Sequence, residues 1–203
     1  KRILSSFIII PIALFFVIKG STFFIFFLSI FFLASSYEWL KMTKKNLIKI
    51  FGILYLCLTF YSAFLLRNEA GLNFFIFIII ICIFTDIGGY IFGKTFKGPK
   101  LTKISPNKTY SGAIGGFILS VMAASIFSHY QKSFSLFEFF MLNNNDLLYI
   151  IIILLISAVS QIGDLIISYF KRLAKIKNTG NLLPGHGGIL DRIDGIIFAI
   201  PFS

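Results

Sequence analysis

Charged residues are scarce in this sequence, and acidic residues are the scarcest. Of the 203 residues, 13% are charged, and 8 Asp and Glu stand against 19 Lys and Arg, for a net charge of +11. Soluble domains carry about 25% charged residues, so the composition argues against a soluble fold. In a soluble protein such a basic excess would indicate nucleic acid, but in a membrane protein it is typical of cytoplasmic loops. We therefore expect no nucleic-acid partner.

Residues that form disulfides or bind zinc are equally few. The two cysteines, Cys57 and Cys82, stand alone in apolar runs, and the sequence has no CxxC motif. The two histidines, His129 and His186, have no Cys or His companion at ligand spacing. The sequence therefore predicts neither a disulfide framework nor a zinc site. We interpret both cysteines as buried filler of the core.

Apolar runs are what the sequence has in abundance. Hydrophobic residues make up 57% of the chain, and 27 residues are Phe. A run of about 20 apolar residues crosses a bilayer once as a helix, and these runs lack the alternation of strands. The sequence predicts an all-α, polytopic transmembrane helical bundle of about seven spans. The runs lie at about 3–18, 22–40, 47–66, 72–93, 112–129, 147–170 and from 190 onward.

Basic residues are distributed unevenly between the segments that connect these runs. With the N-terminus in the cytoplasm, 16 of the 19 Lys and Arg fall on inside segments, and only Lys19, Arg67 and Lys132 fall outside. Cytoplasmic segments of membrane proteins carry such an excess. The sequence therefore predicts a cytoplasmic N-terminus and places two long basic loops, 94–111 and 171–191, on the same side.

A polar stripe follows one face of the run at 147–170. At 100° per residue its members fall within a sector about 100° wide, and the rest of that helix is apolar. A carboxylate inside a span costs about 2.5–3.5 kcal/mol, so Asp164 indicates a water-filled cavity. Hydrogen bonds between helices also explain the serines and the glutamine. The stripe consists of Ser157, Ser160, Gln161, Asp164, Ser168 and Lys171.

A second carboxylate, Asp86, lies near the end of the run at 72–93. We expect Asp86 to pair with a loop lysine or to help hold a cation. Glycines four residues apart are typical of close helix packing, and a dimer through such faces stays open. The glycine pairs are Gly89 with Gly93 and Gly112 with Gly116.

The first basic loop combines hydroxyl groups with lysines and leads into a helix that Gly112 opens. Ser105, Lys108 and Thr109 are its candidate ligands. Positive charge, hydrogen-bond donors and helix N-terminal amides all favour a phosphate. Contact with anionic lipid headgroups also explains a basic loop at this place.

The second basic loop is denser in polar residues and glycine. Asp191 and Asp194 share one face if a helix starts at about Leu190. Glycines let backbone amides approach a ligand closely. Carboxylates that hold Mg²⁺ beside lysines that neutralise phosphate suit metal-assisted phosphoryl chemistry, although no Walker A motif is present. The loop and its flanks contain Ser168, Lys171, Arg172, Lys177, Gly185, His186, Gly187, Gly188, Asp191, Arg192 and Asp194.

These motifs resemble those of phosphatidate cytidylyltransferases, also called CDP-diacylglycerol synthases. The resemblance covers about residues 85–203. The signature of that family matches the second loop in identity and spacing at Ser168, Lys171, Arg172, Lys177, Pro184, Gly185, His186, Gly187, Gly188, Asp191, Arg192 and Asp194. Earlier elements of the family match Asp86, Gly88, Gly89 and Tyr90, then Ser105, Pro106, Lys108 and Thr109, and then Gly163, Asp164 and Leu165.

The sequence departs from the family pattern at three positions. Asn178 stands where the family has Asp, and Ile167 and Ser111 stand near positions where it commonly has Glu. The lost carboxylate at Asn178 argues against a metal or base role for that position. Asp164, Asp191 and Asp194 are retained.

The resemblance implies the reaction of CTP with phosphatidate to give CDP-diacylglycerol and pyrophosphate, with Mg²⁺ and with a second cation left open. It implies metal binding by Asp164, Asp191 and Asp194, with Asp86 as a further candidate. It implies catalytic roles for Lys171, Arg172, His186 and Asp191. Substrate binding falls to Ser105, Lys108, Thr109, Ser168, Lys177, Gly187, Gly188 and Arg192.

The resemblance also implies an organisation and a location. Residues 1–80 are expected to form N-terminal membrane spans, and residues 81–203 a catalytic membrane domain with cytoplasmic loops at 94–111 and 171–191. We expect an integral protein of the bacterial cytoplasmic (inner) membrane, with membrane lipid as a partner and an active site that faces the cytoplasm.

Three other interpretations stay open. A CTP-dependent lipid or polyprenol kinase would share the nucleotide but transfer its γ-phosphoryl group. A small-solute transporter could use Asp86 and Asp164 as coupling sites in the membrane, but it does not need the second basic loop. A catalytically inactive scaffold is suggested only by Asn178.

Overall fold

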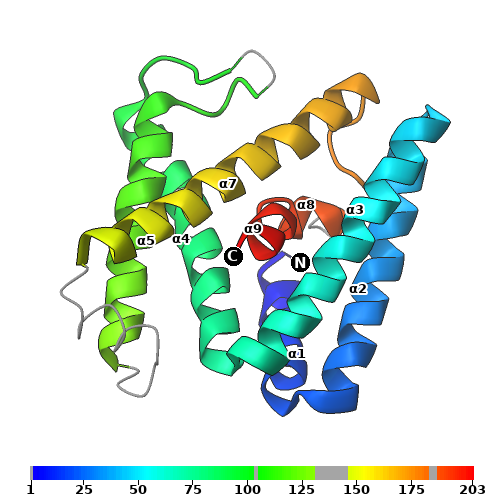
Figure 1. The fold of residues 1–203 in the computed structure, drawn as a ribbon. Coiled ribbons are helices and arrows are strands. Elements are labelled where there is room, and N and C mark those ends of the chain that lie inside the picture. The colour runs from blue at the N-terminus through cyan, green and yellow to red at the C-terminus, as the bar shows by residue number, and fades with distance from the viewer. Residues whose placement is uncertain (1, 103–104, 131–145, 183–186) are drawn as a thin grey trace.

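The computed structural model of this protein describes residues 2–102, 105–130, 146–182 and 187–203 (Figure 1). These ranges are almost entirely helical and contain no strand, only isolated bridge residues such as the pair Lys100 and Thr109. The predicted all-α class is therefore confirmed. The helices are α1 (Arg2–Lys19), α2 (Ser21–Met42), α3 (Asn46–Leu65) with the π-helical turn η1 (Leu66–Ala70), α4 (Leu72–Phe96), α5 (Tyr110–Tyr130), α7 (Asp146–Leu173), α8 (Leu190–Ile193) and α9 (Ile196–Phe202).

Five of the described helices are long and apolar enough to cross a membrane. They are α2, α3 with η1, α4, α5 and α7, and they correspond to the five predicted runs between 22 and 170. The run at 3–18 forms α1, and the run from 190 onward begins as the two short helices α8 and α9. The structure supports five spans, and the expected total of seven stays a prediction.

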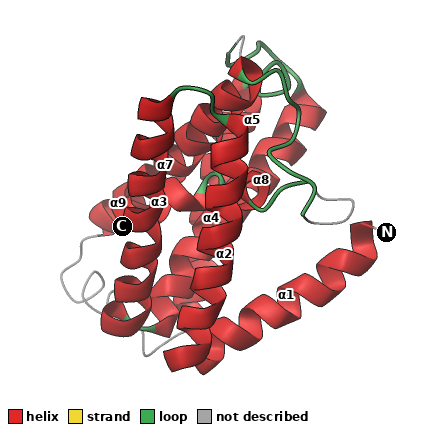
Figure 2. Ribbon diagram, turned by 90° about the vertical axis from the view of Figure 1, so that its right-hand side faces the viewer, coloured by secondary structure: helices red, strands yellow, loops and turns green. Residues whose placement is uncertain are grey.

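The helices form two pairs with α7 between them. α2 and α3 lie side by side on one side of the molecule and α4 and α5 on the other, while α7 runs obliquely from one pair towards the other (Figure 1). α9 packs among α3, α4 and α7, and α8 contacts α2. α1 leads away from the bundle at an angle and contacts chiefly α2 (Figure 2).

Arg67 ties the turn after α3 to the end of α1. Its Nε and Nη2 atoms donate to the carbonyl oxygens of Val17 and Ile18 at 3.0 and 3.3 Å. A helix leaves its last carbonyls without partners, so a basic side chain there satisfies them. This contact gives a structural role to one of the three basic residues outside the predicted cytoplasmic segments.

Glycines bring α4 and α5 into close contact. A Cβ atom at Gly88 would lie 2.4 Å from the carbonyl oxygen of Gly115, and one at Gly112 would lie 2.7 Å from that of Gly89. Gly116 approaches the backbone of Thr85 in the same way. The predicted role of these glycines in helix packing is confirmed. Because they pack α4 against α5 within one chain, they provide no argument for the dimer that was left open.

The two cysteines differ in environment. Cys82 is buried in the core cluster that joins α4 to α7 and α9, as predicted. Cys57 is exposed on α3, so its interpretation as core filler is wrong. It lines an apolar groove between α2 and α3 with residues such as Phe32 and Phe60. A free cysteine behaves as a small apolar side chain and suits such an apolar groove as well as a core, which explains why the apolar run alone suggested burial.

Candidate active site

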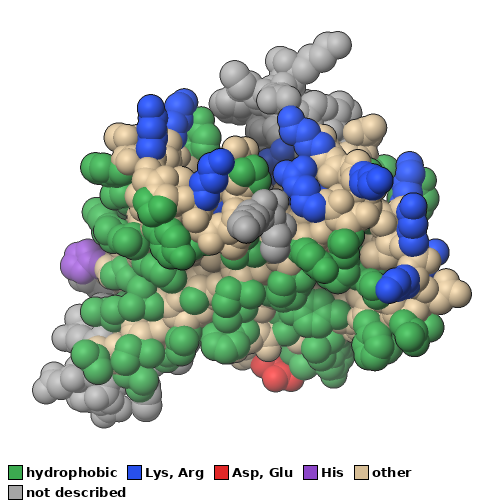
Figure 3. Space-filling model, turned by 90° about the horizontal axis from the view of Figure 1, so that it is seen from above, with side chains coloured by type: hydrophobic (Ala, Val, Ile, Leu, Met, Phe, Trp, Pro, Cys, Tyr) green, Lys and Arg blue, Asp and Glu red, His purple; other side chains and the backbone are tan. Residues whose placement is uncertain are grey.

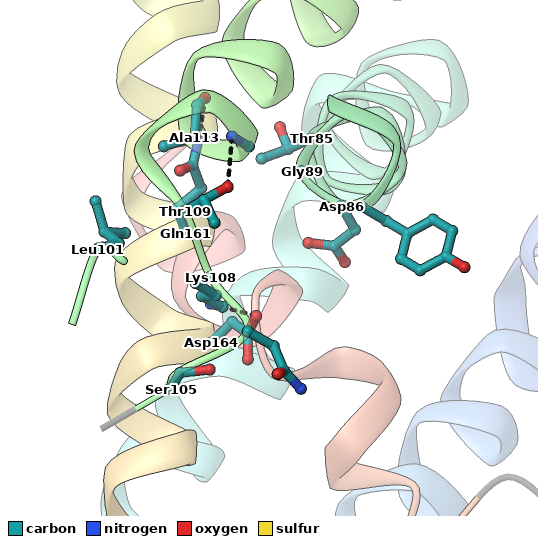
Figure 4. Close-up of a pocket in the computed structure, with 13 residues that line it drawn as sticks. Thr85, Asp86, Gly89, Leu101, Ser105, Lys108, Thr109, Ala113, Gln161 and Asp164 are labelled. Carbon is teal, nitrogen blue, oxygen red and sulfur yellow. Dashed lines mark hydrogen bonds and ion pairs between the residues drawn. The ribbon is translucent and has the colours of Figure 1, made fainter. Parts of the chain in front are cut away.

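A cavity of about 310 Å³ opens between α4, α5, α7 and the loop that joins α4 to α5 (Figure 4). Five predicted site residues line it: Asp86, Ser105, Lys108, Thr109 and Asp164. Thr85, Asn107 and Gln161 also line it and were not predicted as site residues. The structure therefore brings the first basic loop against the polar stripe of α7, as the shared side of the two loops led us to expect.

Backbone hydrogen bonds shape the first loop so that Lys108 points towards α7. The Leu101 amide donates to the Lys108 carbonyl at 2.8 Å, and the Lys108 amide donates to the Ser105 carbonyl at 3.0 Å. Thr109 then caps the N-terminus of α5, because its hydroxyl accepts a hydrogen bond from the Gly112 amide at 3.1 Å. A threonine at this position satisfies an amide that the helix leaves without a partner. The hydroxyl of Thr109 thus has a capping role beside its predicted contact with substrate.

Lys108 and Asp164 form an ion pair at the cavity wall (Figure 4). Their side chains are 26% and 25% exposed, so both remain within reach of solvent and of a ligand. Ser168 donates from its hydroxyl to the other carboxylate oxygen of Asp164 at 3.3 Å. The ion pair joins the first basic loop to α7 through residues that are far apart in the sequence.

Two further carboxyl groups surround Asp164. Asp194 is 8% exposed, and its Oδ1 accepts a hydrogen bond from the Gly195 amide at 3.0 Å. It lies close to Asp164, and burial together with the Asp164 carboxylate raises the pKa of Asp194 well above its ordinary value. Asp86 lies close enough for its charge to act on both. Like charges repel, so two carboxyls in such contact require a proton or a cation between them. This pair is the place in the described structure that best fits a metal ion.

Asp191 is not part of that pair. Lys171 Nζ donates to its Oδ1 at 2.9 Å, and the amides of Thr179 and Gly188 donate to its Oδ2 at 2.8 and 3.1 Å. Burial alone would raise the pKa of Asp191, but these hydrogen bonds and the Lys171 charge hold the pKa below its ordinary value. The carboxylate therefore stays ionised at neutral pH and orients Lys171.

The expected three-carboxylate metal set is thus divided. α8 begins at Leu190, as predicted, but it ends at Ile193, and Asp191 and Asp194 turn to different partners. Among the residues that the structure describes, no three His, Cys, Asp or Glu side chains are grouped to hold one metal ion. Asp164 and Asp194 remain together, and Lys171 connects the two parts because its charge acts on Asp194 as well.

The other predicted residues of the second loop are distributed around this core. Arg172, Lys177 and Arg192 are exposed. Gly187 has a φ of 87°, which favours glycine, and it lies against Asp191. The amide of Gly188 already donates to Asp191, so it is not directed at a ligand. His186 lies outside the described residues.

The three departures from the family pattern have local explanations. Ile167 is buried in an apolar cluster with Trp39 and Leu56, where a carboxylate would lack partners. The hydroxyl of Ser111 donates to the carbonyl of Lys97 and so closes the first loop. Asn178 is exposed and lines a second pocket away from the Asp164 cavity.

Glu38, at the end of α2, is a polar residue of the site region that sequence reasoning missed. It is only 1% exposed and accepts hydrogen bonds from Thr179, Ile189 and Leu190. The sequence did offer a signal for Glu38, because acidic residues are rare in it: Asp and Glu together number 8 in the whole chain. An acidic residue inside an apolar helix needs a partner, and that alone would have marked it.

The chain belongs to the cytidylyltransferase family, whose model matches residues 46–203. Its relatives include the phosphatidate cytidylyltransferase of Rickettsia bellii (strain RML369-C), which is 35% identical over 167 residues, 81% of this chain and 71% of the relative. That of Rickettsia felis (strain ATCC VR-1525 / URRWXCal2) is 31% identical over 204 residues, 98% of this chain and 88% of the relative. The predicted family is thereby confirmed.

Some relatives are considerably longer than this chain. The phosphatidate cytidylyltransferase of Bacillus subtilis (strain 168) is 36% identical over 152 residues, which is 73% of this chain but 53% of the relative. The chain therefore spans about half the length of that relative. The family model matches residues 46–203, which include the motifs of both basic loops.

Proposed function

We propose that this chain transfers the cytidylyl group of CTP to phosphatidate, giving CDP-diacylglycerol and pyrophosphate. The observation that carries the proposal is the Lys108–Asp164 ion pair beside Asp194, at a cavity, in a chain of the cytidylyltransferase family. A transporter would not need the lysine-rich second loop that follows α7. A kinase would use the same nucleotide and must be separated by experiment.

In the proposed reaction an oxygen of the phosphatidate monoester attacks the α-phosphorus of CTP. The bond between the α-phosphorus and its bridging oxygen breaks, and pyrophosphate leaves with the electron pair. A phosphate monoester is largely ionised at pH 7, so the attacking oxygen needs no separate base. Both reactants are anions, and the chain must supply positive charge where they meet.

Lysines from both loops are placed to supply that charge. Lys108 reaches the cavity from the first loop, and Lys171 is held by Asp191 at the end of α7. Arg172 and Lys177 are exposed beside Lys171 and extend the positive surface to a bound triphosphate. Lysine acts as a mobile point charge for phosphate, so Lys108 can exchange its ion pair with Asp164 for one with substrate.

Asp164 and Asp194 are the residues that would hold Mg²⁺. Magnesium in phosphoryl-transfer sites is typically bound by one or two carboxylates together with waters and substrate phosphates. A pair of carboxyl groups in contact, with oxygen ligands only, fits that requirement without a third protein ligand. When bound, the ion would neutralise the phosphates and the charge that develops on pyrophosphate.

Removal of divalent cations should abolish turnover. The purified protein in detergent should lose activity in EDTA and regain it with Mg²⁺ or Mn²⁺, because the carboxylate pair and the triphosphate repel without an ion between them. Synthesis of CDP-lipid is the measurement. The thermal midpoint in EDTA serves as the control, since it separates loss of the ion from loss of the fold. Full turnover in EDTA would contradict the metal assignment.

The activity itself is tested with CTP that carries a label in either its α- or its γ-phosphate. The proposed reaction puts the α-label into lipid and releases the γ-label as pyrophosphate. A lipid kinase would put the γ-label into lipid and release the α-label as CDP. If neither label enters lipid from a folded protein with Mg²⁺ and phosphatidate, the cytidylyltransferase proposal fails. The same assay with a diacylglycerol or polyprenol acceptor tests the kinase, which fails if the γ-label does not enter lipid.

We further propose that the N-terminus and both basic loops lie in the cytoplasm and that the protein resides in a bacterial inner membrane. The support is the count of 16 of 19 basic residues on one side. On the face seen in Figure 3, Lys and Arg side chains gather in one half and hydrophobic side chains cover the other. CTP is a cytoplasmic nucleotide, and a site that uses it must open to that side.

A cysteine at Asn181 should report this sidedness. Asn181 is exposed in the second loop, and the natural thiols are removed by Cys57→Ala and Cys82→Ala. A membrane-impermeant thiol reagent should label Asn181→Cys in inverted vesicles and not in intact cells, and CTP with Mg²⁺ should slow the labelling. A cysteine at Asn68, which is exposed in η1 beside Arg67, is the matched control and should show the opposite pattern. Labelling of Asn181→Cys from outside would overturn the topology.

A further inference from the structure

Glu38 is a buried carboxylate that the proposed reaction does not use. Its side chain is 1% exposed, near the C-terminal end of α2. Removing a carboxylate from water costs several kcal/mol unless hydrogen bonds or charges compensate. Acidic residues are rare in this chain, so a buried glutamate at the end of α2 calls for an explanation.

Three donors from the second loop satisfy this carboxylate. The Ile189 amide donates to Oε1 at 2.9 Å, and the Leu190 amide donates to Oε2 at 2.9 Å. The Thr179 hydroxyl donates to Oε2 at 2.8 Å. Glu38 thus binds the chain on both sides of the loop, at Thr179 and at the start of α8. These partners lie more than 140 positions away in the sequence.

The same stretches of backbone hold Asp191. Thr179 gives its hydroxyl to Glu38 and its amide to Asp191. Gly188 gives its amide to Asp191, and the next two amides go to Glu38. Asp191 in turn holds Lys171 Nζ at 2.9 Å. Glu38 and Asp191 therefore accept hydrogen bonds from the same two stretches of the second loop, and the position of Lys171 depends on both carboxylates.

Glycines allow Glu38 to come this close. A Cβ atom at Gly180 would lie 2.5 Å from Oε1 of Glu38, and one at Gly188 would lie 2.4 Å from Oε2. No real Cβ contact is that short, so both positions require glycine for the backbone to surround the carboxylate. The neighbouring Trp39 packs edge-on against Phe170 of α7 with ring centroids 4.9 Å apart, which fixes the end of α2 against the site.

We infer that Glu38 is a positioning residue for the cytidylyl-transfer reaction, acting through the second loop on Asp191 and Lys171. The inference rests on the proposed function, because Lys171 is taken to contact the triphosphate. It adds a residue from α2 to a site that otherwise comes from α4, α5, α7 and α8. Glu38 also lies before the first residue that the family model matches, which is residue 46.

The test compares Glu38→Gln with Glu69→Gln. Gln keeps the volume of Glu but replaces one acceptor oxygen by a donor that opposes the loop amides. kcat/KM for CTP should fall at least tenfold in Glu38→Gln, while KM for phosphatidate stays within about twofold of wild type. Glu69 is an exposed glutamate in η1, and its substitution should change neither. A lower thermal midpoint with unchanged kcat/KM would show a purely structural role and overturn the inference.

A second variant keeps the test decisive if Glu38→Gln does not fold. Thr179→Val removes one donor to Glu38 without touching α2, and it should lower kcat/KM for CTP in the same direction. If both single variants fold, the double variant should be less than additive, because residues of one hydrogen-bond network are coupled. If the losses in kcat/KM are strictly additive in the double variant, or if Thr179→Val has wild-type kinetics, the inference that Glu38 acts through the second loop is contradicted.

Labelling of the loop gives a readout that does not depend on activity. Asn181→Cys on the cysteine-free background should react at least threefold faster with a thiol reagent when Glu38→Gln releases the loop, and Glu69→Gln should leave the rate unchanged. If the wild-type protein makes no CDP-lipid, the proposed function fails, but the labelling rate still tests whether Glu38 holds the second loop. An active wild-type protein with unchanged labelling and kinetics in Glu38→Gln overturns the inference alone.

Discussion

Asp164→Asn should lower kcat/KM by about a hundredfold or more and leave the fold intact. Loss of one preorganised charged group in a site commonly costs 10²–10³ in rate. Asn has the shape of Asp but cannot pair with Lys108 as an anion or contribute a negative ligand beside Asp194. CDP-lipid synthesis by the purified variant is the measurement.

The fold should survive this substitution because Asp164 lies among other carboxyl groups. The charge of Asp164 acts on both Asp86 and Asp194, so removal of this negative charge relieves repulsion that offsets the lost ion pair with Lys108. We expect the thermal midpoint to stay within about 4 °C of wild type, which corresponds to roughly 1 kcal/mol.

Ser157→Ala is the matched control on the same stripe of α7. Ser157 is fully buried, and its hydroxyl lies 2.7 Å from that of Thr85 on α4. Removing it should cost about 1 kcal/mol of stability and leave kcat/KM near wild type, because it does not reach the carboxyl pair. An Asp164→Asn variant that behaves like Ser157→Ala would show that Asp164 serves helix packing only.

The stripe of α7 shows how far a local pattern predicts a site. Its period places six polar residues on one face, and both open interpretations are correct for different members. Ser157 and Gln161 bond to Thr85 and to the Ala113 carbonyl and so join helices. Asp164 and Lys171 instead hold partners from the two loops. Periodicity predicts which face of α7 is polar. It does not predict what each polar side chain contacts, because those contacts come from other elements.

The division of the predicted metal set has the same cause. Spacing places Asp191 and Asp194 three residues apart on one helix, and that helix begins where it was expected. Which donors meet each carboxylate depends on how the second loop returns to α7, and composition does not specify that path. Asp191 therefore meets Lys171 and two amides, whereas Asp194 meets Asp164.

The contacts of Glu38 are even harder to predict from the sequence than those of Asp191 and Asp194. Glu38 is the one acidic residue of α2, and its three partners are 141 to 152 positions away. Two of them are backbone amides, which every residue carries, so no residue type marks them. The spans and the chemistry-bearing loops follow from local patterns, but a contact of this kind exists only after the chain has folded.

Gly88→Ala should have the largest effect on stability, because α4 and α5 meet there backbone to backbone. A Cβ atom at this position would lie 2.4 Å from the carbonyl oxygen of Gly115 and 2.8 Å from the Cα atom of Gly116. Backbone atoms within two long helices cannot rotate away, so the helices must separate. Overpacking of this kind costs about 1–3 kcal/mol and occasionally more, and we expect the upper end.

The separation would also reach the site. Asp86 stands on α4 two residues before Gly88, and Thr109 leads into α5 next to Lys108, so both cavity walls move when the helices part. Gly89→Ala is the matched control, since a Cβ atom there meets only the Gly112 carbonyl oxygen at 3.9 Å, an ordinary contact. Alanine also favours a helix over glycine by about 1 kcal/mol, so this variant should unfold at the wild-type temperature or above it. Thermal unfolding in detergent measures both. If the two variants lose equal stability, α4 is intolerant of alanine in general, and the close packing at Gly88 is not what joins the two walls of the cavity.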